Sequence, residues 1–253
     1  LAGIKKVNPY KDLFGFIKGA KTKGRAVHVL PPYRAENTIR ISELLDTHHS
    51  KVKEMVSLEL VKAVIALRSI KDEYEIEEIE KAVYTAYLMH TTSMQMAMPG
   101  NVEQEIAGAI EGIALSHGGP VSFPVILSMN GQILHNHYHG NVLEKGRMMV
   151  TDAGAETAMR YASDITRTVP VGGKFSQRQK EIYEIVLNAN MKAIEATKPG
   201  IFNKDLHLLA VKTIASGLKD LGIMKGNIDE AVKNGAHALF MPHGLGHMMG
   251  LDV

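Results

Sequence analysis

The chain has no cysteine among its 253 residues, which excludes disulfide bonds and metal sites built on thiolates. A chain without cysteine suits a reducing compartment, and we expect a cytoplasmic protein. Long apolar runs are also lacking, since none approaches the roughly 20 residues that a membrane-spanning helix needs. The opening segment, LAGIKKVNPYKD, has no apolar centre of the kind found in signal peptides.

A strong charge of either sign is missing as well. Lysine and arginine total 29, and aspartate and glutamate total 27. This balance gives no electrostatic reason to expect nucleic acid or an anionic membrane as a partner. What the chain does have is an ordinary globular composition, with 45% apolar and 22% charged residues. Its length allows a sizeable core in one large domain or two small ones.

The sequence changes character near residue 67. Residues 1–66 are mixed, with a short predicted strand over Arg25–Leu30 that ends at Pro31. They are too few to bury a core of their own, so they read as part of something larger. From residue 67 onward, helix pairs alternate with strand-like segments, which predicts an α+β domain over 67–253. The expected helices begin at the capping residues Asp72, Asn101, Ser176 and Asn203.

Two aspartates occupy matching places in a predicted hairpin. If 147–156 and 161–170 pair as antiparallel strands, the turn centres near Ala158, and Asp152 and Asp164 lie six residues on either side of it. They would then be cross-strand neighbours with Cβ atoms about 5 Å apart. Carboxylates that close repel unless one is protonated or a cation lies between them. Such a pair is compatible with a site for hard or borderline divalent ions. The alternative, a register shifted by one residue with each aspartate facing water, is the more common outcome of this spacing.

The segment ILHNHYHGN places His135, His137 and His139 at every second position. On a strand these three side chains would point to one side. Exposed histidines on a strand are common, so the pattern alone leaves a functional role and a purely structural one equally open.

The histidines of MPHGLGHMMG, His243 and His247, are four residues apart. On a helix such a pair can chelate one metal ion. Gly244 and Gly246 argue instead for irregular backbone that comes close to a ligand. A glycine-rich loop with incidental histidines is the alternative.

Taken together, three segments resemble one family of enzymes. TDAGAETAMRYASDITRTVPVGGKF, ILHNH and MPHGLGHMMGLDV are similar to the catalytic domain of proline-specific metallopeptidases, aminopeptidase P and Xaa-Pro dipeptidase (prolidase). The resemblance implies the pita-bread fold, an α+β architecture shared with methionine aminopeptidase and creatinase. It covers 67–253 closely, and residues 1–66 resemble the end of the family's α/β N-terminal domain.

The resemblance implies a dinuclear metal site. Family members hold two divalent ions, usually manganese or cobalt, and zinc is also accepted by such ligands. Asp152 and Asp164 match the two aspartate ligands, and His247 matches the histidine ligand.

Two further histidines match residues that are not ligands in the family. His135 matches a histidine near the scissile bond. His243 matches one that holds substrate or stabilises developing charge. The resemblance therefore implies catalytic roles for both side chains beside the metal site.

The resemblance also implies parts that lie outside this chain. The family's two glutamate ligands and a further histidine follow the HGLGH motif, beyond Val253. We therefore expect a fragment, shortened at both ends, that binds metal weakly and is inactive alone. The complete protein is expected to hydrolyse the bond between an N-terminal residue and a following proline, and to form homo-oligomers.

Several alternatives stay open on the sequence. A dipeptidase acting on Xaa-Pro dipeptides only would carry the same motifs. A creatinase-like relative without metal would have no use for Asp152 and Asp164 together, and a non-catalytic relative would not need the intact ligands. The segment before the catalytic domain argues against methionine aminopeptidase.

Overall fold

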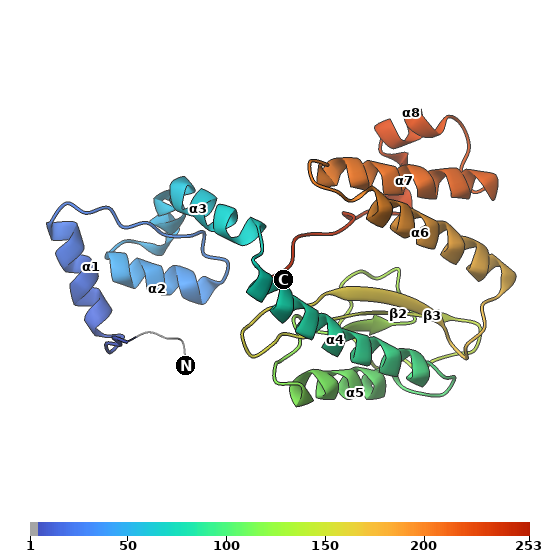
Figure 1. The fold of residues 1–253 in the computed structure, drawn as a ribbon, viewed down its shortest axis with the longest axis horizontal. Helices are drawn as coiled ribbons and strands as arrows, with labels where there is room; N and C mark the ends of the chain where they lie inside the picture. Colours follow the sequence, from blue (N-terminus) through green and yellow to red (C-terminus); the bar gives the residue numbers. More distant parts are fainter. Residues whose placement is uncertain (1–4) are drawn as a thin grey trace. The chain divides into compact units, whose positions relative to one another are not determined.

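The computed structural model describes residues 5–253, and the chain divides into two compact units, unit 1 (Leu1–Ile70) and unit 2 (Lys71–Val253). Figure 1 follows the chain through both. The assignment of 1–66 and 67–253 to separate domains of a larger protein stays a prediction. In the described residues, no helix is both long and apolar enough to cross a bilayer.

Unit 1 is built of short helices. They are α1 (Asp12–Thr22), α2 (Ala35–Leu45), the 3-10 helix η1 (His49–Met55) and α3 (Leu58–Ser69). The strand predicted over 25–30 is wrong, because Val29 makes only an isolated bridge to Val56. Pro31 and Pro32 follow directly and have no N–H to extend a ladder. Leu45 and Val52 are buried apolar side chains of this unit.

Unit 2 contains an antiparallel sheet in the order β1 (Ile126–Ser128), β2 (Met148–Ala153) and β3 (Ile165–Pro170). Two helices, α4 (Glu73–Met96) and α5 (Glu103–Ser116), pack along one face of it. Figure 1 shows this pair below the strands. The opposite face of the sheet, which carries Asp152, is not covered by these two helices.

The helix ends test the predicted caps. Asp72 caps α4 in a capping box with Glu75, as predicted. The predicted cap of α5 is wrong: its N-cap residue is Val102, and the Asn101 side chain instead donates to the carbonyl of Met96 at 2.8 Å. That bond ties the end of α4 to the turn that starts α5.

A second helical layer follows the sheet in the chain. It comprises α6 (Gln177–Ala196), α7 (Asn203–Asp220), α8 (Ile228–Lys233) and the 3-10 helix η2 (Ala236–Leu239). Ser176 caps α6 as predicted, whereas Asn203 is the first residue of α7 rather than its cap. Val211, Ala215 and Leu218 of α7 form the centre of a separate apolar cluster.

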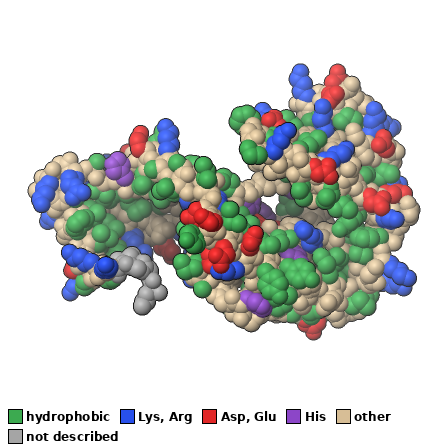
Figure 2. Space-filling model, in the orientation of Figure 1, with side chains coloured by type: hydrophobic (Ala, Val, Ile, Leu, Met, Phe, Trp, Pro, Cys, Tyr) green, Lys and Arg blue, Asp and Glu red, His purple; other side chains and the backbone are tan. Residues whose placement is uncertain are grey.

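The main core lies between the sheet and the α4–α5 pair. Along β2, Met149 and Ala153 are buried against these helices, and Val150 and Asp152 are less buried on the opposite face. This alternation follows from the period of two along a strand. On the molecular surface, acidic and basic side chains are interspersed on the face shown in Figure 2, in keeping with the balanced composition.

One buried carboxylate organises the loop between β1 and β2. Glu103 at the start of α5 is 0% exposed. Its carboxylate accepts hydrogen bonds from Ser128 Oγ at 3.2 Å, Met129 N at 2.8 Å and Asn141 Nδ2 at 2.8 Å. These donors lie on both sides of the segment 130–140, so Glu103 fixes both ends of the loop that carries His135.

We expect Glu103→Ala to lower the free energy of unfolding by about 2–5 kcal/mol, because three donors around this fully buried side chain lose their acceptor. Urea denaturation followed by circular dichroism measures this loss. Glu111→Ala, on the exposed side of the same helix, is the control and should change the value by less than about 0.5 kcal/mol. Equal effects of the two substitutions would contradict the structural role of Glu103.

Candidate functional site

The two aspartates meet on the open face of the sheet, but not in the predicted register. Asp152 of β2 lies opposite Thr166 of β3, and Ala153 lies opposite Ile165. Asp164 is therefore a diagonal neighbour of Asp152, and the predicted direct pairing is wrong by two residues. A shift of two keeps side chains on the same face because the strand period is two, so both carboxylates still belong to one site.

The β2–β3 turn leaves no room for a side chain at Gly154. A Cβ there would lie 1.7 Å from the carbonyl oxygen of Ser163. This close approach of the two backbones comes two residues after Asp152 and one residue before Asp164. Glycine in the DAG motif thus allows the strands to converge where the carboxylates are needed.

The Asp152 carboxyl is electrostatically strained. Burial raises its pKa most, and the negative charge of Asp164 raises the pKa further. The hydroxyl of Thr166, which donates to Asp152 Oδ1 at 2.9 Å, opposes that rise, as does the charge of nearby His135. Two carboxyls held together at this cost are typical of a cation site.

His247 reaches Asp164 through backbone pairing at the end of the chain. Leu251 bridges Tyr161, and the amide of Ala162 donates to the carbonyl of Gly250 at 2.8 Å. The segment is consequently held beside the β2–β3 turn. His247 Nε2 then lies 3.0 Å from Asp164 Oδ2, although the two residues are 83 positions apart in sequence (247 − 164).

The remaining histidines occupy loops. His243 lies in irregular backbone with its Nδ1 2.8 Å from the carbonyl of Gly244. The strand predicted for the histidine-rich segment is wrong, since 131–140 contains no strand and His135 has a positive φ of 53°. His139 Nδ1 lies 3.0 Å from the carbonyl of Leu127, which gives that residue a structural contact. His137 has no assigned role.

Asp152, Asp164 and His247 offer donor atoms of the kinds that a divalent ion binds, but they are few. Carboxylate oxygens and an imidazole nitrogen are ligands that manganese, cobalt and zinc accept. Among residues 5–253, no three histidine, aspartate or glutamate side chains form a group that could by itself hold an ion. Asp152, Asp164 and His247 consequently do not form a metal site by themselves among these residues.

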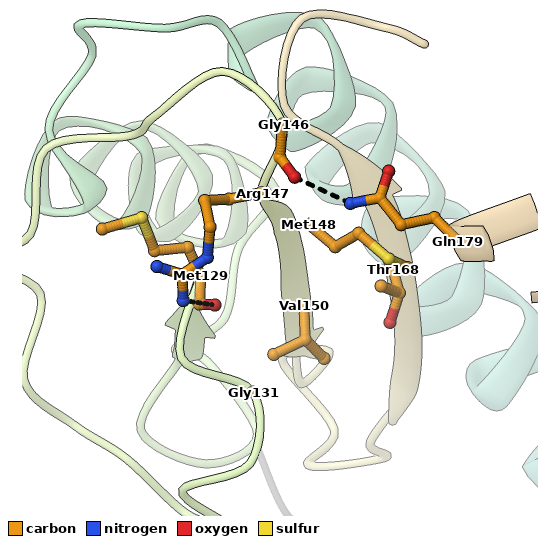
Figure 3. Close-up of a pocket in the computed structure, with 8 residues that line it drawn as sticks. All are labelled: Met129, Gly131, Gly146, Arg147, Met148, Val150, Thr168 and Gln179. Atoms are coloured by element: carbon orange, nitrogen blue, oxygen red, sulfur yellow. Dashed lines mark hydrogen bonds between the residues drawn. The ribbon is translucent and has the colours of Figure 1, made fainter. Parts of the chain in front are cut away.

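A cavity of about 410 Å³ lies further along the strands, and Asp152, Asp164 and His247 are not among the residues that line it. Val150 and Thr168, which pair across β2 and β3, line it on the face of Asp152. Figure 3 shows Arg147 bonded to the carbonyl of Met129 and Gln179 bonded to that of Gly146 at its rim. These bonds hold the loops on both sides of the cavity in place.

Sequence reasoning missed the support behind the site. His90 and Ser93 of α4 are buried and touch β2 from the opposite face. Burial lowers the pKa of His90 and favours its neutral form. Polar residues on the apolar side of a predicted helix were the available signal.

The comparisons with known proteins agree with this geometry. Residues 77–253 match the model of metallopeptidase family M24. A probable Xaa-Pro aminopeptidase of Chaetomium globosum is 36% identical over 234 residues, which cover 91% of this chain and 38% of the relative. A Xaa-Pro aminopeptidase of Haemophilus influenzae is 38% identical, covering 87% of this chain and 48% of the relative. The chain thus spans less than half the length of these relatives.

Solved structures show the same fold. Aminopeptidase PepP of Pseudomonas aeruginosa superposes with a TM-score of 0.84 at 29% identity, covering 99% of this chain and 58% of that one. An Escherichia coli aminopeptidase P variant in complex with substrate gives a TM-score of 0.82 at 29% identity, covering 99% and 59%. A zinc-substituted form of the latter protein is similar to the same extent. The predicted pita-bread architecture is confirmed.

We expect Asp152→Asn to stabilise the metal-free chain at pH 7, because it removes the buried charge that Asp164 repels. The raised pKa means that wild type loses stability as the pH rises from the ordinary aspartate value to the raised folded value, and the variant does not. The melting temperature should rise by a few degrees (about 2–4 °C per kcal/mol). The difference should shrink as the pH falls to and below the ordinary aspartate value of about 3.9, where the wild-type carboxyl becomes protonated in both the folded and the unfolded state.

Thermal unfolding in EDTA at several pH values checks this prediction. Glu111→Gln removes one exposed charge and serves as the matched control, with no comparable dependence on pH. A gain for Asp152→Asn that persists unchanged at low pH would rule out the electrostatic explanation.

Proposed function

Because the chain belongs to metallopeptidase family M24, we propose that it carries part of the active site of a metal-dependent Xaa-Pro aminopeptidase. The substrate would be a peptide with proline at its second position. The site would hold two divalent ions, with manganese the first choice and cobalt or zinc as substitutes. A cytoplasmic location and a homo-oligomeric state remain part of the proposal.

The convergence of Asp152, Asp164 and His247 carries this proposal. They come from β2, from the residue before β3 and from the end of the chain, and His247 Nε2 is 3.0 Å from Asp164 Oδ2. A structural role alone would not explain a pair of crowded carboxyls with an imidazole against one of them. The relatives named as Xaa-Pro aminopeptidases support the assignment to this reaction.

Two of the three proposed ligands, Asp152 and His247, are oriented by a neighbour. Thr166 donates to Asp152 Oδ1 at 2.9 Å and so fixes the rotation of that carboxylate. His247 Nδ1 lies 3.0 Å from the carbonyl of Met248, and a proton held on Nδ1 leaves Nε2 as the nitrogen for a metal ion. These partners would keep the donor atoms pointed at one place.

The other site residues would act on the substrate. Divalent ions in such a site supply an acidified water and polarise a carbonyl group. His135, which lies near Asp152, would contact the peptide beside the bond to be cleaved. His243, on the loop before His247, would donate to developing negative charge. The cavity beside Val150 and Thr168 would leave space for the peptide along the strands.

The proposed ligand set is completed by two glutamates outside this sequence. Three donors leave the charge of two divalent ions poorly neutralised, so we propose that the 253-residue chain alone binds metal weakly and is inactive. The test consequently needs a longer protein that contains this chain and a segment after Val253.

We expect that longer protein, supplied with Mn²⁺, to cleave both Xaa-Pro dipeptides and longer Xaa-Pro peptides. Asp164→Ala should reduce kcat/KM by more than about 100-fold, since even outer partners of metal ligands cost about 10–100-fold. Release of the N-terminal residue, measured by chromatography, gives the rates. Glu111→Ala is the control and should retain activity.

The substrate panel separates the alternatives. Cleavage of dipeptides only would replace the proposal with a dipeptidase. No cleavage of either substrate, or equal activity of Asp164→Ala and wild type, would show that the motif is an inherited scaffold.

A further inference from the structure

Two polar contacts tie α4 to β2 on either side of Asp152. Ser93 Oγ lies 2.7 Å from Thr151 Oγ1, and His90 Nε2 lies 3.2 Å from the carbonyl oxygen of Ala153. All the side chains involved are nearly inaccessible, with Ser93 and Thr151 1% exposed and His90 4%. The residues before and after Asp152 are thus each held from the buried face of the sheet.

Packing does not explain these contacts. The surroundings are apolar, with Met89, Met149 and Ala153 in the same core cluster. Valine has nearly the shape of threonine and would fill position 151 without a hydroxyl that must be paired. A buried hydrogen bond between a helix and a strand instead specifies one alignment, because sliding either element leaves both partners unpaired.

The alignment matters for the residue in between. Thr151 and Ala153 point toward α4, and Asp152 points to the open face because side chains alternate. Fixing the two flanking residues fixes the height and direction of the backbone that carries the Asp152 carboxylate. Thr166 then sets the rotation of its side chain on the other face.

We propose that Ser93 and His90 are positioning residues, which hold Asp152 in the geometry that metal binding needs. The consequence for metal binding rests on the proposed function. The effect on the backbone does not, so the two can be tested apart.

The decisive comparison is Ser93→Ala against the double variant Ser93→Ala with Thr151→Val. The single variant leaves the Thr151 hydroxyl unpaired and should lower the urea midpoint. The double variant replaces both hydroxyl-bearing side chains by apolar ones of similar shape, so no buried hydroxyl is left unpaired and the urea midpoint should be restored. If these contacts served stability alone, the double variant would also regain the wild-type amide exchange rates of β2 and the wild-type affinity for Mn²⁺.

We expect the double variant to keep a loosened β2 despite its restored stability. Native-state hydrogen exchange in EDTA should show the amides of 151–153 exchanging about 5- to 10-fold faster than in wild type. Thr85→Val is the matched control, because the Thr85 hydroxyl is buried on the same helix but bonds to the carbonyl of Lys81. Unchanged exchange in the double variant would overturn the proposal.

Mn²⁺ affinity, measured by calorimetry on the longer protein, gives the second readout. The double variant should bind about 10-fold more weakly than wild type, within the range known for outer partners of ligands. Affinity equal to wild type, with restored stability, would overturn the positioning role. If wild type itself binds no Mn²⁺, the proposed function fails, and the exchange rates still decide whether α4 positions Asp152.

His90 is tested by a conservative pair. His90→Gln keeps an N–H donor near the position of Nε2, and His90→Leu removes it. The exchange of 151–153 should stay near the wild-type rate in the first variant and rise about 5-fold or more in the second. Equal rates in both variants would remove His90 from the proposal.

Discussion

The alternation of side chains along β2 is the constraint on which the site depends. Met149, Thr151 and Ala153 face α4, so Met148, Val150 and Asp152 must face the other way. Burial of the first set against an apolar helix pair stabilises the strand. Because side chains alternate along the strand, the same burial places the carboxylate of Asp152 on the open face.

Backbone pairing brings the distant parts of the site to that carboxylate. The β2–β3 ladder places Asp164 diagonally beside Asp152, and the bridge from Tyr161 to Leu251 brings in the loop of His247. Glu103 holds both ends of the loop that carries His135. The positions of Asp164, His247 and His135 therefore depend on contacts made by residues outside the candidate site.

The partly buried carboxyl group of Asp152 costs the fold stability. Burial and the charge of Asp164 both raise the pKa of Asp152, so the folded chain holds a carboxylate where a neutral group would fit better. Unfavourable electrostatics of this kind are common where function, rather than folding, has set the residue. The surrounding core compensates, because the helices and β2 bury apolar side chains close by.

The sequence by itself determined the starts of α4 and α6 and the family. The capping residues Asp72 and Ser176 and the helical spacing are local signals, since caps and periodicity act within a few residues. The motifs around Asp152, Asp164 and His247 were sufficient for the family and the fold. Tertiary structure alone decided the register of the hairpin, the irregular backbone around His135 and the contact of His247 with Asp164. These depend on pairing between segments far apart in the chain, such as the approach of Gly154 to Ser163, which local patterns do not encode.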